Sequence, residues 1–221
     1  AQMDISFIER FLPMYVTAAQ LTLTIALIGI AISVGIGIAA SLALYYRIPG
    51  LRQLVAVYVE LSRNTPLLVQ LFFLYFGLPK IGIRLSPELC GIIGLSFLGG
   101  AYMTETFRAG LETVERIQTE SALSLGMSRA ATMRYIVLPQ AMAVSVPSLV
   151  ANSIFLIKET SVFSGIALAD LMYVTKDLIG IYYQTTEALF MLVIAYLALL
   201  LPISLLGTLL ERRLRNAGFG N

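Results

Sequence analysis

The chain has 221 residues, of which 58% are hydrophobic and only 13% are charged. Soluble domains carry roughly 25% charged residues, so this composition excludes an ordinary soluble domain and indicates a polytopic membrane protein. The chain lacks histidine, the commonest general base and metal ligand, and its single cysteine, Cys90, excludes an internal disulfide. We therefore expect no catalytic group and no metal site.

No lysine follows a glycine, so the chain contains no phosphate-binding G-x-x-x-x-G-K-[ST] loop. If the protein uses ATP, a partner chain must bind and hydrolyse it. We expect this chain itself to carry no cofactor.

The first segment, Asp4–Tyr15, mixes charged and apolar side chains. Its apolar positions fit a helix that lies on the outer surface of a membrane. These positions are Phe7, Ile8, Phe11 and Leu12.

Uncharged runs then predict five membrane spans. The first run lies between Arg10 and Arg47 and has 36 residues. The later runs are Asn64–Pro79, Leu89–Thr104, Tyr135–Ile157 and Ala188–Leu210. A span needs about 20 apolar residues, and the second and third runs have only 16 each. We interpret these two as inner helices whose ends carry charge.

The basic residues orient these spans. Ten of them fall in the connections after the first, third and fifth spans. Four fall in the N-terminal segment and in the connections after the second and fourth spans, and Lys158, near the end of a span, is left out. Because cytoplasmic loops carry the excess of Lys and Arg, the N-terminus is placed outside and the C-terminus inside. The predicted fold is all-α, with five transmembrane helices in a single transmembrane domain over residues 1–221.

A polar loop of about thirty residues, 109–138, lies between the third and fourth spans, on the predicted cytoplasmic side. It contains Glu120-Ser-Ala-Leu-Ser-Leu-Gly126 and, after nine further residues, Ile136-Val-Leu-Pro139. Small Ala122 would let a partner approach closely, and Gly126 permits a sharp turn. The loop is either a docking surface for a cytosolic partner or an ordinary amphipathic connection.

This spacing resembles the cytoplasmic loop of bacterial ABC importer permeases, E-A-A-x-x-x-G, nine residues, then I-x-L-P, with Ser121 at the first alanine. Other segments resemble the polar amino acid uptake branch of that family, and the similarity runs from about residue 15 to 215. These segments are Glu60–Phe73, in which Asn64 replaces a glycine, Ala101–Gly110 and Lys158-Glu159-Thr160-Ser161.

The resemblance implies a permease subunit of an ATP-driven amino acid importer in the bacterial cytoplasmic membrane. It also implies several partners: a second permease chain, ABC ATPase subunits, an extracytoplasmic substrate-binding protein and the amino acid. Membrane lipid surrounds such a protein, and no nucleic acid is expected. The expected ATPase-coupling residues are Glu120, Ala122, Gly126, Ile136 and Pro139.

Charged groups inside spans are costly and tend to face the bundle interior. Glu105 and Arg108 are three residues apart, so we predict a structural ion pair. We predict a substrate pocket centred on Glu159, which would hold an ammonium group and so favour a basic amino acid, although Lys158 could neutralise that preference. Thr160 and Ser161 would lie nearby, and Asp170 is a further candidate.

Three other functions remain possible from the residues. An ion-coupled secondary amino acid transporter could use Glu159 or Glu105 as a proton site, but such folds usually show internal repeats and none is found here. A membrane anchor or signalling subunit would not need Lys158 and Glu159 near the membrane. An intramembrane enzyme lacks the residues for a recognisable site.

Overall fold

The computed structural model describes the backbone of residues 3–218 and the side chains of residues 3–213, and the described chain contains helices and no strands. The predicted all-α class is confirmed. The longer helices are α1 (Ile5–Tyr45), α2 (Leu51–Asn64), α4 (Pro87–Glu112), α7 (Leu138–Glu159), α8 (Leu171–Tyr182) and α9 (Thr185–Gly218). The shorter elements are α3 (Leu67–Phe72), α5 (Arg116–Ser124), α6 (Arg129–Thr132), the π-helical turns η1 (Phe73–Gly77) and η3 (Met133–Val137), and the 3₁₀ turns η2 (Leu78–Ile81) and η4 (Thr160–Ile166).

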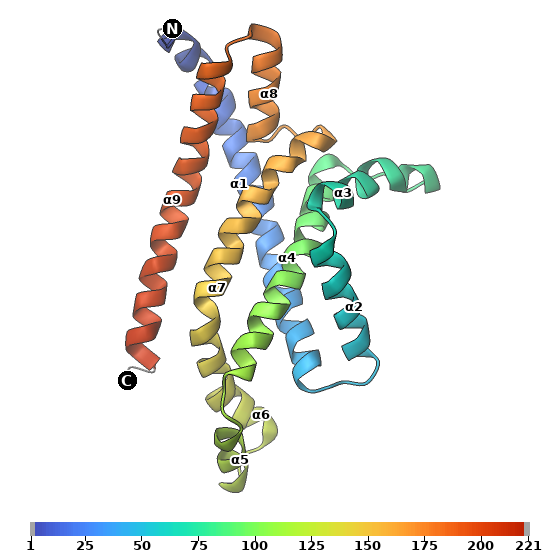
Figure 1. Cartoon of the computed structure of the whole chain (residues 1–221), viewed down its shortest axis with the longest axis vertical. Helices are drawn as coiled ribbons and strands as arrows, with labels where there is room; N and C mark the ends of the chain where they lie inside the picture. Colours follow the sequence, from blue (N-terminus) through green and yellow to red (C-terminus); the bar gives the residue numbers. More distant parts are fainter. Residues whose placement is uncertain (1–2, 219–221) are drawn as a thin grey trace.

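Four long helices, α1, α4, α7 and α9, run along the length of the molecule (Figure 1). Small residues let α1 and α4 approach closely: a β-carbon on Gly37 would lie 2.8 Å from the backbone of Met103. The main core gathers around α4, where Leu95, Leu156 and Phe163 are fully buried. α4 is therefore the central helix of the bundle.

The N-terminal segment is not a separate surface helix, and that prediction is wrong. Asp4 caps a single helix of 41 residues that continues to Tyr45. At 1.5 Å per residue this helix is about 62 Å long, twice the thickness of a bilayer core. Phe7, Phe11 and Tyr15 are buried against α8 and α9, so packing holds this segment as the first part of α1.

The second predicted span, Asn64–Pro79, starts too early: its first residue ends α2, and the apolar helical stretch Leu67–Ile81 begins only after Pro66. α2 ends at Asn64, and the chain turns through Thr65 and Pro66 before α3 begins. Proline lacks the N–H that a continuing helix needs, and it pushes the residue before it into extended backbone; Thr65 has φ −111° and ψ 123°. α2 and α3 consequently run in different directions (Figure 1).

Three segments of the described chain are long and apolar enough to cross a membrane by themselves: Ile5–Tyr45, Arg129–Ile166 and Thr185–Arg213. They contain the first, fourth and fifth predicted spans. α4 contains the third and, with 26 residues, is about 39 Å long. The total of five spans and their orientation stay predictions.

Candidate functional site

The predicted docking loop forms a compact helical unit. α5 and α6 project beyond the ends of α4 and α7 at the lower end of the molecule (Figure 1). Ser128 caps α6, since its Oγ accepts a hydrogen bond from the amide of Ala131 at 3.2 Å. Leu125 is 85% exposed and Ile117 is 64% exposed. The loop thus presents apolar side chains on a unit that extends away from the bundle.

Gly126 makes the turn that ends α5. Its φ is +86°, in the left-handed region that favours glycine. The amide of Met127 donates to the carbonyl of Ala122 at 3.1 Å, as expected where a helix closes on a left-handed residue. A β-carbon on Gly126 would meet no atom within 4 Å. The glycine is thus required by the backbone conformation and not by lack of space.

The other expected coupling residues lie in different surroundings. Glu120 is exposed and pairs with Arg116 at 2.9 Å. Ala122 is buried within the chain, so here its side chain supports the loop and does not face outward. Ile136 is half-buried in η3, and Pro139 is exposed at the start of α7. Their role towards an ATPase stays a prediction.

A glutamine pair that sequence reasoning missed joins the loop to the bundle. The side-chain amide of Gln140, in α7, donates to Oε1 of Gln118, in α5, and to the carbonyl of Ile136 at 3.0 Å. The two glutamines are 22 residues apart, so no local spacing rule could pair them. This contact ties α5 to the beginning of α7.

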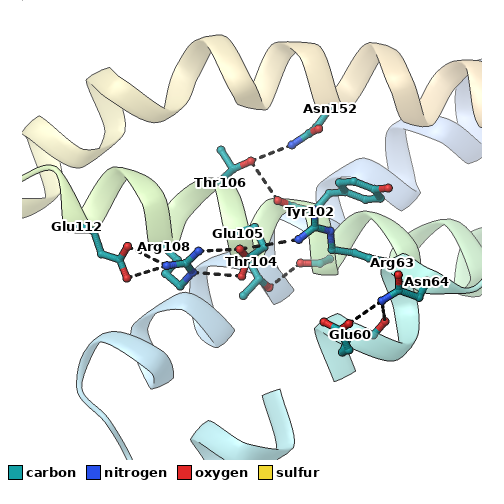
Figure 2. A network of polar contacts seen from close by, with 11 residues as sticks. Glu60, Arg63, Asn64, Tyr102, Thr104, Glu105, Thr106, Arg108, Glu112 and Asn152 are labelled. Atoms are coloured by element: carbon teal, nitrogen blue, oxygen red, sulfur yellow. Dashed lines mark hydrogen bonds and ion pairs between the residues drawn. The ribbon is translucent and has the colours of Figure 1, made fainter. Parts of the chain in front are cut away.

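The C-terminal half of α4 carries a network of charges (Figure 2). Arg108 donates to Glu105 at 2.8 Å and to both oxygens of Glu112 at 2.8 Å, so the predicted Glu105–Arg108 pair is present. Arg63 of α2 approaches Glu105 at 3.9 Å and lies over the ring of Tyr102, 5.3 Å from its centroid. The network therefore also ties α2 to α4.

Thr106, the residue after Glu105, makes a contact on another face of α4. Thr106 accepts a hydrogen bond from the side-chain amide of Asn152, in α7, at 2.8 Å (Figure 2). Neighbouring positions on α4 thus join it to α2 and to α7. The sequence shows these residues as isolated polar groups in apolar surroundings, a weak signal that names no partners.

The predicted pocket residues surround the point where α7 stops. α7 ends at Glu159, and the polar residues after it form the tighter turn η4, so the helix breaks at this element. Glu159 and Ser161 are half-buried, and Lys158 is exposed. Thr160 is fully buried and donates to the carbonyl of Ile157 at 2.7 Å. Glu159 and Lys158 make no ion pair among the described side chains.

Asp170 lies at the end of this segment and caps α8. Its Oδ1 accepts from the amide of Tyr173 at 2.9 Å, whereas its Oδ2 is buried without a hydrogen-bond partner. Burial raises the pKa of this carboxyl to about 6. In this conformation Asp170 is closed off from solvent, and a contact with substrate stays a prediction.

Residues 31–216 match the family described as the inner membrane component of binding-protein-dependent transport systems. The chain belongs to this family. The match covers the α5–α6 loop and the break after α7. The predicted resemblance to ABC importer permeases and the multi-pass location in the cytoplasmic membrane are therefore confirmed, and the ion-coupled alternative is set aside.

Named relatives agree with this membership. The chain is 31% identical over 216 residues to the glutamine transport system permease protein GlnP of Escherichia coli (strain K12), covering 97% of this chain and 99% of the relative. It is 39% identical over 152 residues to the probable glutamine ABC transporter permease protein GlnP of Bacillus subtilis (strain 168), covering 69% of this chain and 70% of the relative.

Solved structures share the fold. A crystal structure of an amino acid ABC transporter with histidines is matched with a TM-score of 0.88 at 31% identity, covering 96% of this chain and 100% of that one. The inward-facing MetNI methionine ABC transporter is matched with a TM-score of 0.76 at 18% identity, over 93% of this chain and 98% of that one. The second likeness concerns the fold alone.

Proposed function

We propose that this permease subunit imports a polar amino acid, with ATP hydrolysed on partner subunits that dock on the α5–α6 loop. Glutamine is the first substrate to test, since glutamine is named for the relatives in Escherichia coli and Bacillus subtilis. A second permease chain and an extracytoplasmic binding protein complete the assembly. The five-span topology, with the loop in the cytosol, belongs to the same proposal.

One observation supports the loop as the coupling element. α5 is held to α7 by the Gln118–Gln140 hydrogen bond, while its apolar residues Ile117 and Leu125 stay exposed. Exposed apolar side chains on a rigid projection suit a partner protein, and a rigid link would carry the partner's motion into the bundle. A small shift of one packed helix against another can switch a bundle between two arrangements.

Glu159 supplies the negative charge of the proposed pocket. The carboxylate stands half-buried where α7 stops, and Lys158 lies exposed beside it. Adjacent helix residues point about 100° apart, so Lys158 does not cover Glu159. The carboxylate would hold the α-ammonium group that every amino acid carries. A basic amino acid is the second candidate, because its side chain offers another cation.

The test is ATP hydrolysis by the purified complex in lipid, with its binding protein and single amino acids added in turn. We expect glutamine to stimulate hydrolysis, and Glu159→Gln to raise the concentration needed by about tenfold, the loss of one charge-assisted hydrogen bond. Glu88→Gln is the matched control, because Glu88 is exposed in the first turn of α4 and should leave that concentration unchanged.

The outcomes separate the parts of the proposal. Stimulation by arginine or lysine alone would replace glutamine with a basic substrate. Unchanged affinity in Glu159→Gln would remove Glu159 from the pocket and leave the importer in place. If no amino acid stimulates hydrolysis, the substrate class itself is wrong.

A further inference from the structure

A cavity of about 590 Å³ opens between the inner parts of α1, α2 and α4. Seven charged side chains line it, and most are already partnered. Glu105 and Glu112 pair with Arg108, and Arg63 approaches Glu105. The remaining carboxylate, Glu60, accepts a hydrogen bond from the side-chain amide of Asn64 at 2.9 Å. The last two charged side chains that line the cavity are Arg47 and Arg52.

Arg47 and Arg52 flank the turn between α1 and α2. Both are exposed, and neither makes an ion pair or a side-chain hydrogen bond with any described residue. The amide of Arg52 donates to the carbonyl of Ile48 at 3.0 Å, which fixes the second residue of α2 one turn from Arg47. Two guanidinium groups therefore reach one cavity from the same turn.

The backbone adds to this positive charge. α2 begins at Leu51, its N-cap is Gly50, and no side chain caps it and no acidic residue lies in its first turn. The dipole and the unbonded N–H groups at a helix N-terminus attract anions; in the first turn of α2 the amide of Arg52 is already bonded to Ile48. Arg47 itself has φ +52° because it closes the end of α1: its amide donates to the carbonyl of Leu44 and the amide of Ile48 donates to the carbonyl of Ala43, each at 3.1 Å, which is the usual pattern of a left-handed helix end.

The surroundings of the two arginines are those of a membrane interface. Apolar and aromatic side chains beside them are exposed: Tyr46, Ile48, Leu51 and Leu54, with 43–67% of their surface accessible. Aromatic rings and cations together mark the level of lipid headgroups. A soluble anion would gain nothing from these side chains, whereas a phospholipid would place its phosphate on the arginines and its acyl chains against them.

We propose that Arg47, Arg52 and the N-terminus of α2 bind the phosphate of an anionic phospholipid at the inner surface of the membrane. The site assumes the orientation proposed above, and its cavity is not lined by Glu159 or by the residues next to it. A second cavity, of about 550 Å³, is also lined by Arg47 and by Arg116, Glu120 and Arg129 of the α5–α6 loop. A bound headgroup would therefore lie beside the α5–α6 loop.

The test is native mass spectrometry of the purified complex, released from membranes of phosphatidylethanolamine and phosphatidylglycerol. We expect the wild-type complex to retain phosphatidylglycerol, and the variant Arg47→Gln/Arg52→Gln to retain it about thirtyfold less, since two cations near a charged lipid together contribute about 2 kcal/mol. Arg47→Lys/Arg52→Lys, which keeps the charge, should restore most of the retention.

Arg212→Gln/Arg213→Gln is the matched control, because these two arginines lie near the end of α9 and line neither cavity. It should retain the lipid as wild type does. Equal retention by all variants, or equal loss in the control, would overturn the site. Displacement of the lipid by excess inorganic phosphate would show that the site takes a free anion instead. ATP hydrolysis stimulated by amino acid, measured on the same samples, reports on the transport function independently.

Discussion

Asp170 is the residue whose protonation the fold most clearly disturbs outside the membrane spans. It caps α8 through one carboxylate oxygen while the other oxygen is buried without a partner. Burial raises its pKa from an ordinary value of 3.8 to about 6. Between these two values the folded protein keeps a proton that the unfolded chain has released. The free energy of unfolding should therefore fall as the pH rises from about 4 to 6 and then level off.

The substitution Asp170→Asn tests this directly. Asparagine keeps a good helix cap and removes the buried charge, so the variant should lose this pH dependence and be the more stable protein above pH 6. Two pKa units correspond to about 3 kcal/mol. The measurement is the midpoint of thermal unfolding of the purified protein from pH 4 to 8.

Asp177 provides the control for this experiment. It lies on α8 with an exposed side chain, so Asp177→Asn should keep the wild-type profile. If Asp170→Asn proves less stable than wild type at pH 7, the buried carboxylate is satisfied by a group other than the helix cap, and the argument from burial fails.

Single residues also mark the limit of what the sequence can predict. The Glu105–Arg108 pair follows from a spacing of three on one helix, and the sharp turn at Gly126 follows from glycine chemistry. Arg63 and Asn152 could not be connected to α4, because residues far apart in sequence have no fixed distance until the helices pack. The same holds for Gln118 and Gln140.

At the level of elements, an uncharged run alone does not show where a helix begins. A run without charges, Asn64–Pro79, hides a break that Pro66 imposes. The charges in Asp4–Tyr15 suggested a surface helix, whereas Phe7 and Phe11 pack against Tyr182 and hold the segment in α1. Hydropathy indicates whether a segment can lie in lipid, whereas packing against neighbouring helices determines the direction of that segment.

The α5–α6 unit is the element on which transport should depend most. Gly126→Val places a β-branched side chain at φ +86°, where the strain would reshape the end of α5. We expect the complex to assemble and hydrolyse ATP, but with amino acid uptake into proteoliposomes reduced at least tenfold per ATP consumed. Gly126→Asn should retain most uptake, because asparagine tolerates the left-handed conformation.

Gly180→Val is the matched control for the loop. Gly180 also has open space around it but carries no positive φ, so the variant should transport normally. Normal coupling in Gly126→Val would mean that the turn after α5 is not where ATP hydrolysis is linked to transport.

At the scale of the whole molecule, the proposed orientation joins all the sites. The α1–α2 turn, the α5–α6 unit and the C-terminal part of α9 lie at one end, and α8 lies at the other (Figure 1). Ten basic residues lie in the connections after the first, third and fifth predicted spans, against four in the other connections. The positive-inside rule places that end in the cytosol, where an ATPase and an anionic leaflet would both meet it.

Introduced cysteines test this orientation. The native Cys90 is fully buried, so it should not react in the folded protein. Leu125 and Tyr183 are each 85% exposed, at opposite ends of the molecule. In intact cells a membrane-impermeant maleimide should label Tyr183→Cys and leave Leu125→Cys unlabelled, and both should react in opened membranes. Labelling of Leu125→Cys alone in intact cells would invert the topology and move both the coupling loop and the lipid site to the outer surface.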